Sequence, residues 1–174
     1  VNTVQGYNPV TNTTVDFTAT DPYPELTSPG AVEVVGNKAY SFGGFDAVVT
    51  TAGCHVFDIN AADGARWTSC PDLNLSRSYI GTAVVDGVIY AAGGDTWDGA
   101  ALIAQTIVEK LDTANPTAWD DASVADLPVA CDEFRAFGFD TNSGYDVAGK
   151  IIAAGCGQWP NAIADSSIYD VAAN

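Results

Sequence analysis

The sequence predicts an all-β fold made of about three copies of a four-stranded antiparallel unit. Hydrophobic residues make up 47% of the 174-residue chain, whereas Asp, Glu, Lys and Arg together make up only 16%. The apolar runs are short, rich in Val, Ile, Ala and Tyr, and bounded by Gly, Asn and Asp, which is typical of strands joined by turns. One pattern also recurs along the chain, and internal repetition is the signature of a repeat architecture.

The repeat is clearest in the segments Gly30–Phe45 and Gly81–Asp95, in which Tyr40 and Tyr90 align at a separation of 50 residues. The segment Phe137–Gln158 repeats the pattern with a longer turn. Each copy has a glycine pair after its second apolar run, in the order Gly43-Gly44, Gly93-Gly94 and the interrupted Gly155-Cys156-Gly157. In the second copy Asp86-Gly87 predicts a two-residue hairpin turn, because that turn needs positive φ at both central positions.

Each copy then continues with a strand that ends in an apolar residue and Asp, followed after a turn by a further aromatic residue. The strand ends are Phe57-Asp58, Leu111-Asp112 and Tyr169-Asp170, with Tyr7-Asn8 as the counterpart near the N-terminus. The aromatic residues that follow are Phe17, Trp67 and Trp119. We expect the two indoles to pack between neighbouring copies.

This combination of a glycine pair, a Tyr-Asp-like strand end and a spaced Trp resembles the Kelch repeat across essentially the whole chain. Arg77 and Arg135 fall where Kelch repeats often carry Arg, and Thr27 replaces it in the first copy. The resemblance implies β-propeller blades of four antiparallel strands. The expected parts of this single partial propeller are the end of one blade at 1–20, complete blades at 21–70 and 71–128, and an incomplete blade at 129–174.

A propeller closes with about four to eight blades, so about three blades do not close alone. We therefore expect other protein chains or missing blades at both propeller edges. The formal net charge of −16 argues against nucleic acid and anionic membranes as partners, because no cluster of basic residues offsets it. We interpret the scattered acidic residues as favouring solubility rather than cation binding. No apolar stretch is long enough for a membrane-spanning helix, so no membrane insertion is expected.

Four cysteines allow three disulfide pairings on spacing alone. The strand order implied by the repeat selects Cys54–Cys70 and Cys131–Cys156, because each pair then joins neighbouring strands. Disulfides indicate an oxidising compartment and favour a secreted or extracellular protein. Two N-glycosylation sequons, at Asn12 and Asn74, agree with a secreted glycoprotein.

Two tryptophans follow their glycine pairs at equivalent places in the loops between the second and third strands. Aromatic faces beside carboxylates and amides are suited to carbohydrate recognition, although the same indoles could instead pack on adjacent blades. The residues of this candidate ligand site are Asp95, Trp97, Asp98, Gln158, Trp159 and Asn161.

A second candidate site is a possible calcium-binding turn formed by Asp140, Asn142 and Asp146, where oxygen-bearing side chains alternate. The turn departs from the helix–loop–helix calcium pattern, and a polar hairpin turn explains it equally well. No other cofactor is expected.

We predict an extracellular, non-enzymatic binding or assembly module that could bind carbohydrate. One alternative is a scaffold fragment of a secreted Kelch-type enzyme such as a copper-radical oxidase. The resemblance implies that such a site needs two histidines, and this chain has only His55, so we identify no catalytic residue. Another alternative is a structural subunit of an extracellular polymer.

Overall fold

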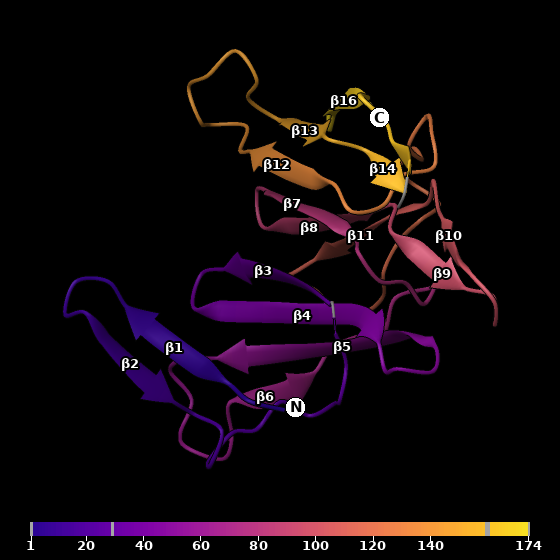
Figure 1. Ribbon diagram of the computed structural model, residues 1–174. Coiled ribbons are helices and arrows are strands. Elements are labelled where there is room, and N and C mark those ends of the chain that lie inside the picture. The colour runs from indigo at the N-terminus through magenta and orange to yellow at the C-terminus, as the bar shows by residue number, and fades with distance from the viewer. Residues whose placement is uncertain (1, 29, 159–160, 174) are drawn as a thin grey trace.

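The computed structural model describes residues 2–28, 30–158 and 161–173, and within these residues every regular element is a strand (Figure 1). Three larger antiparallel sheets follow one another along the chain, and β7 of the second sheet packs against β3 of the first and β12 of the third. The all-β prediction is confirmed. The stacking of similar sheets through their first strands is the arrangement of propeller blades.

The first sheet has four strands in the order β3-β4-β5-β6. Its strands are β3 (Ala31–Val35), β4 (Lys38–Phe45), β5 (Thr50–Asp58) and β6 (Trp67–Ser69). The second sheet orders its strands β7-β8-β11, and Lys110 of β11 forms an isolated bridge with Asp120 at the place of a fourth strand. Its strands are β7 (Gly81–Val85), β8 (Val88–Ala92) and β11 (Val108–Asp112).

The third sheet has the order β12-β13-β16. Its strands are β12 (Arg135–Phe139), β13 (Lys150–Ala154) and β16 (Ser166–Asp170). Three two-stranded hairpins accompany these sheets, and β9 and β10 project to one side of the stack in Figure 1. The hairpins are β1 (Gln5–Asn8) with β2 (Thr13–Asp16), β9 (Asp95–Trp97) with β10 (Leu102–Ala104), and β14 (Gly157–Gln158) with β15 (Asn161–Ala162).

Local turn chemistry fixes the hairpin at the start of the second sheet. Asp86 and Gly87 both have positive φ, at 49° and 78°, and Val85 pairs with Val88 across them. This is the two-residue turn expected from Asp-Gly, because its twist matches that of the flanking strands.

The glycine pairs allow successive blades to approach closely. A Cβ on Gly43 would lie 2.6 Å from the carbonyl oxygen of Arg77, and one on Gly93 would lie 2.3 Å from that of Cys131. Both contacts join one blade to the segment that leads into the next. Glycine is therefore required at these positions for packing as well as for its positive φ.

The two predicted inter-blade tryptophans occupy equivalent places. The Trp119 ring lies 4.9 Å from Phe42 of the preceding sheet, and its Nε1–H donates to the carbonyl of Pro71 at 2.8 Å. The Nε1–H of Trp67 donates in the same way to the carbonyl of Asp21 at 3.1 Å. Each indole thus joins its own blade to the segment that enters that blade.

Both predicted disulfides are present, with Cα atoms 5.1 Å apart for Cys54–Cys70 and 5.3 Å apart for Cys131–Cys156. The first links β5 to the residue after β6, so it crosses neighbouring strands as expected. The second links the segment before β12 to the segment after β13. No helix among the described residues is long and apolar enough to cross a membrane.

The alignment of Arg135 with Arg77 is wrong. The amide of Gly44 donates to the carbonyl of Arg77, and the equivalent amide of Gly94 donates to that of Cys131. Cys131 therefore occupies the place of Arg77 in the third copy, and Arg135 begins β12 four residues later as an exposed side chain. Leu127 and Cys131 contact Gly93 as Leu73 and Arg77 contact Gly43, so the two entry segments have the same spacing and an alignment on Arg alone is displaced by four residues.

Candidate functional site

An aromatic pocket lies between the β9–β10 hairpin and the loops of the first sheet, and its cavity measures about 320 Å³. We call it the aromatic pocket. Its lining residues are Ser28, Phe45, Ser78, Tyr79, Trp97 and Leu102. Trp97 is half-buried and lies edge-on to Phe45, with ring centroids 6.0 Å apart. Tyr79 is 37% exposed at the rim.

Two matching turns hold the walls of the pocket. Asp98 follows Trp97 and accepts hydrogen bonds from the amides of Ala100 and Ala101 at 2.8 Å. Asp46 follows Phe45 and accepts from the amides of Val48 and Val49 at the same distance. These backbone hydrogen bonds lower the pKa of both carboxyl groups. An ionised aspartate thus fixes each turn directly after an aromatic residue.

Trp97 is among the residues predicted from the sequence, whereas its partners Phe45 and Tyr79 are not. An aromatic residue followed by Asp is repeated in Phe45-Asp46 and Trp97-Asp98, and this signal could have identified Phe45. Tyr79 has a φ of 52°, a left-handed conformation that is uncommon for a residue with a side chain. No sequence pattern predicts that Tyr79 lies at the pocket.

The other predicted ligand residues lie in different places. Asp98 is exposed and its carboxylate holds its own turn, whereas Asp95 is 1% exposed and faces the interior. Gln158 pairs through its backbone with Asn161 in the β14–β15 hairpin, and Trp159 lies outside the described residues. The structure therefore brings Trp97 and Asp98 together at one surface but places Asp95 beneath it.

Asp95 meets a second buried carboxyl group, that of Asp132, in the segment before β12. Asp95 and Asp132 are 1% and 2% exposed, and each carboxyl group lies close enough to the other to affect its pKa. Burial, together with the neighbouring Asp95 charge, raises the pKa of Asp132 to about 6, and burial also raises the pKa of Asp95. Two acids in one dry site are expected to share a proton.

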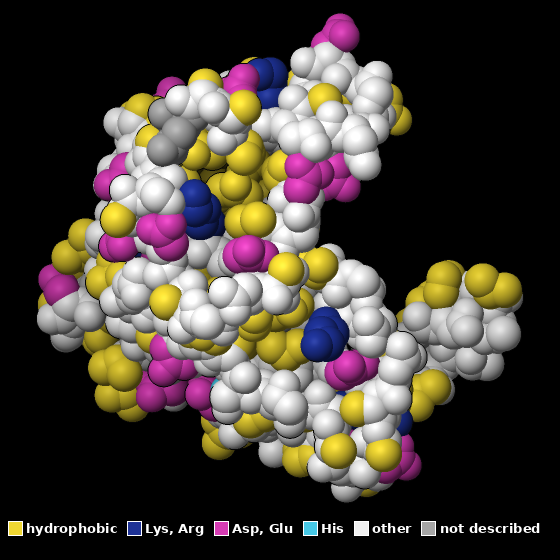
Figure 2. Space-filling model, turned by 180° about the vertical axis from the view of Figure 1, so that it is seen from behind, with side chains coloured by type: hydrophobic (Ala, Val, Ile, Leu, Met, Phe, Trp, Pro, Cys, Tyr) yellow, Lys and Arg dark blue, Asp and Glu magenta, His cyan; other side chains and the backbone are white. Residues whose placement is uncertain are grey.

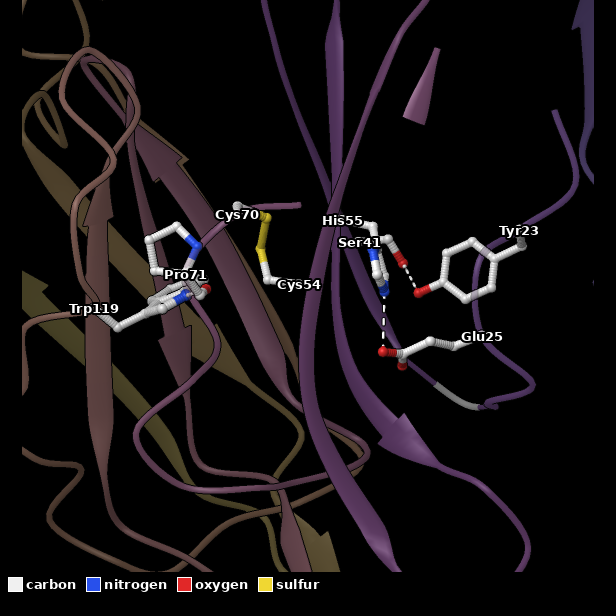
Figure 3. Close-up of a disulfide and its surroundings, with 8 residues drawn as sticks. All are labelled: Tyr23, Glu25, Ser41, Cys54, His55, Cys70, Pro71 and Trp119. Carbon is white, nitrogen blue, oxygen red and sulfur yellow. Dashed lines mark hydrogen bonds and ion pairs between the residues drawn. A yellow bond between two sulfur atoms is a disulfide. The ribbon is translucent and has the colours of Figure 1, made fainter. Parts of the chain in front are cut away.

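The single histidine lies on the face of β5 opposite to Cys54 (Figure 3). His55 Nε2 lies 3.0 Å from Glu25 Oε1, and its ring is edge-on to Tyr23 with centroids 5.7 Å apart. The Tyr23 hydroxyl lies 2.9 Å from Ser41 Oγ. This group joins the segment before β3 to the centre of the first sheet, and its contacts are those of a structural histidine.

The proposed calcium turn docks on the preceding blade. Asp140 Oδ1 accepts a hydrogen bond from the Asp86 amide at 2.7 Å, and Asp86 accepts from the amide and hydroxyl of Thr141. Asn142 and Asp146 are exposed. Among the described residues no group of three or more His, Cys, Asp or Glu side chains is arranged to hold a metal ion. These contacts connect the turns of two adjacent blades.

Both glycosylation candidates are exposed, but they differ in their contacts. Asn12 lies in the β1–β2 turn with a φ of 54°, and its Oδ1 accepts from the Tyr7 hydroxyl. Asn74 Nδ2 donates to the carbonyl of Trp119 at 3.1 Å. A glycan on Asn74 would have to replace that hydrogen bond, whereas Asn12 lies on an open turn.

Acidic side chains are spread over the surface shown in Figure 2, with few basic side chains between them. The aromatic pocket is accordingly a small apolar site on an acidic protein. Its chemistry is stacking and apolar contact, because its lining contains three aromatic rings and no Lys, Arg or His.

Comparisons with known proteins agree with the repeat architecture. No family profile matches the chain. The Kelch-like protein terF of Aspergillus terreus is 31% identical over 138 residues, which are 75% of this chain and 29% of that protein. The propeller-like structure titled "Structure of YjhT" superimposes with a TM-score of 0.74 at 14% identity. That match covers 96% of this chain and 49% of the other, so the chain spans about half or less of either protein. The chain belongs to the Kelch-repeat family of propeller-like proteins.

Proposed function

We propose that this protein is an extracellular, non-enzymatic binding module whose aromatic pocket takes carbohydrate. The Kelch-type propeller-like fold points to a binding or scaffold module, and the two disulfides are compatible with an extracellular protein. The observation that carries the ligand class is the aromatic wall formed by half-buried Phe45 and Trp97 and by Tyr79 at the rim. Such rings stack on the apolar faces of sugars while polar groups at the rim bond the hydroxyls.

The pocket is suited to one or two sugar rings rather than to a charged ligand. Its volume of about 320 Å³ lies at the small end of ligand pockets. The acidic surface repels polyanions such as nucleic acids and sulfated glycans. We therefore expect a neutral glycan.

The test is a neutral-glycan array followed by titration calorimetry of the positive glycans. Trp97→Ala should weaken binding about tenfold or more, because base-to-aromatic and sugar-to-aromatic stacking interactions are of order 1–3 kcal/mol. Trp97→Phe should retain part of the affinity. The matched control is Tyr145→Ala, which removes an exposed aromatic side chain outside the pocket and should leave binding unchanged. Absence of neutral-glycan binding, or equal effects of the two alanine variants, would refute the carbohydrate assignment.

A second proposal concerns assembly. An apolar cavity of about 300 Å³ lies between the second and third sheets. Ala92 and Ile151 line this cavity, and they are the counterparts of Phe42 and Ile89 in the preceding repeats. Phe42 and Ile89 belong to one core cluster with Trp119. The cavity therefore corresponds to the place that Trp119 fills between the first two sheets. On the outer edge of the third sheet, Ile168 of β16 is 65% exposed. We propose that a tryptophan-bearing strand from the rest of a longer propeller pairs with β16 and fills this cavity.

The register follows from the first sheet, where Trp67 pairs with Phe57 immediately before Asp58. The incoming indole should lie opposite Tyr169, which also precedes an Asp. Its N–H should reach the carbonyl of Ala125, the counterpart of Asp21 and Pro71. The greater length of both related proteins supports the same source for this strand.

A peptide with the sequence of residues 115–124, which contains Trp119, provides the probe. Added to the protein, it should bind at β16 and shift the amide NMR signals of Ser166–Asp170, while the same peptide with Trp119→Ala should not. Equal binding of both peptides would contradict the cavity assignment. Dimers of the unmixed protein in sedimentation experiments, abolished by Ile168→Lys, would show instead that a second copy covers this edge.

A further inference from the structure

Two carboxyl groups from different blades meet in the interior below the aromatic pocket. Asp95 is the first residue of β9, and Asp132 lies in the segment that enters the third sheet. Their backbones form separate bridges, Asp95 with Ser78 and Asp132 with Gly157. Both side chains are almost completely buried. The pair therefore connects the second and third blades through side chains alone.

The surroundings supply little positive charge to the pair. Ser78 Oγ donates to Asp95 Oδ1 at 2.5 Å, and Asp132 Oδ1 has no further hydrogen-bond partner among the described residues. Neither carboxyl group forms an ion pair with a described Lys, Arg or His. The charges that act on the pair are the two carboxyl groups themselves and that of the neighbouring Glu133. All three are acidic.

Elementary chemistry then limits the protonation states. A hydrogen bond between two carboxyl groups requires one proton between them, because two ionised carboxylates have only acceptors. Ionisation of both groups would place two like charges in a buried site without compensation, which is strongly unfavourable. A direct hydrogen bond between these two buried carboxyl groups therefore requires at least one of them to be protonated.

This contact lies directly behind the pocket wall. Ser78, which binds Asp95, is at the base of the aromatic pocket, and Trp97 is two residues after Asp95 on β9. Alternate residues of a strand point to the same face. A movement of Asp95 away from Asp132 therefore shifts both Ser78 and Trp97, which are two of the residues that shape the pocket.

We propose that Asp95 and Asp132 share one proton, and that loss of this proton weakens the contact between their two segments and loosens the aromatic pocket, so that ligand binding weakens as the pH rises. The effect on binding rests on the proposed carbohydrate function. The proton-dependent contact between the blades does not.

The direction of the pH effect follows from linkage. The pKa of Asp132 is raised from 3.8 to about 6, so the folded protein holds a proton that the unfolded chain releases. The stabilising contribution is present below the unfolded pKa, and it is lost as the pH rises from about 4 through about 6. Stability from this pair is thus highest in mildly acidic solution.

The test compares the wild-type chain with Asp132→Asn, whose amide keeps the shape of the protonated acid. Urea unfolding between pH 4.5 and pH 8 should show the wild-type folding constant falling by about 30-fold relative to that of the variant. Asp95→Asn provides a second variant if the first does not fold, and it should also flatten the profile. Asp121→Asn, an exposed acid outside both the pair and the pocket, is the matched control and should keep the wild-type profile.

Trp97 provides the local readout. Its fluorescence should change with pH in the wild-type protein and in Asp121→Asn, but not in Asp132→Asn. If glycan binding is found, it should weaken over the same pH interval only in proteins that keep both acids. An unchanged pH profile in both pair variants would overturn the proposal. A pH-dependent contact without glycan binding would refute only the proposed carbohydrate function.

Discussion

The junction between the first and second sheets differs from the junction between the second and third, although both are built from the same repeat. At the first junction the indole of Trp119 lies between the sheets against Phe42 and bonds Pro71. At the second junction the equivalent space is an apolar cavity of about 300 Å³. The repeat therefore specifies how the blades are placed, while single large side chains decide how well a junction is filled.

The entry segments of the two blades are also anchored differently. Arg77 is fully buried, bonds the carbonyls of Gly93 and Ile107, and forms an ion pair with buried Glu109 at 2.8 Å. In the next blade the equivalent position is Cys131, which is covalently bound to Cys156. An ion pair and hydrogen bonds thus anchor the entry segment of the second blade, whereas a disulfide anchors that of the third.

Removal of the buried cation should have the largest effect. Arg77→Met should lower the free energy of unfolding by about 3–5 kcal/mol, because it leaves the Glu109 carboxylate buried without its partner. The double variant Arg77→Met with Glu109→Leu should recover much of the loss. Urea denaturation provides the measurement, and a loss no larger than that of the exposed Arg135→Met would contradict the role assigned to Arg77.

Removal of a disulfide should have the second-largest effect on stability. Replacement of either cystine by two serines should cost about 3 kcal/mol, with similar values for the two loops, which close over 16 and 25 residues. Their local effects should differ. Loss of Cys131–Cys156 should increase amide hydrogen exchange mainly in β12, β13 and β16, because the described residues place an apolar cavity rather than an indole at that junction. Uniform exchange throughout the chain in that variant would show that the third sheet is no more weakly attached than the others.

The smallest effect is expected at the indole hydrogen bond. Trp119→Phe keeps an aromatic ring against Phe42 but removes the donor to Pro71, which should cost about 1–2 kcal/mol including lost packing. Trp97→Phe, at the exposed pocket, should cost less than about 0.5 kcal/mol. Thermal and urea unfolding of both variants measures the difference. Equal losses would show that Trp97 is as structural as Trp119.

Much of the fold was predictable because its determinants are local. Alternating apolar residues and the Asp86-Gly87 turn specify strands and hairpins within a few residues of chain. The glycine pairs recur at one place in the repeat, and the structure shows close approach between blades at Gly43 and Gly93. The two cystines followed from strand order, because neighbouring strands bring Cβ atoms within bonding reach.

The candidate site was only partly predictable. Trp97 and Asp98 stand out as an aromatic residue and an acid after a glycine pair, whereas Asp95 has the same local setting yet points inward to Asp132. The direction of the side chain on the first residue after a glycine pair depends on contacts with the neighbouring blade. Tyr79 reaches the pocket through a left-handed backbone conformation that its own sequence does not favour.

The sequence by itself determined the repeat, the strands, the turns and the cysteine pairs, since each depends on residues close in the chain or on one sheet. The tertiary structure alone decided that Cys131, not Arg135, takes the place of Arg77. It also decided that Phe45, Tyr79 and Trp97 share a pocket and that two buried acids from different blades lie close together. These contacts join successive blades, and their partners follow from the stacking of whole sheets, which depends on all their side chains together.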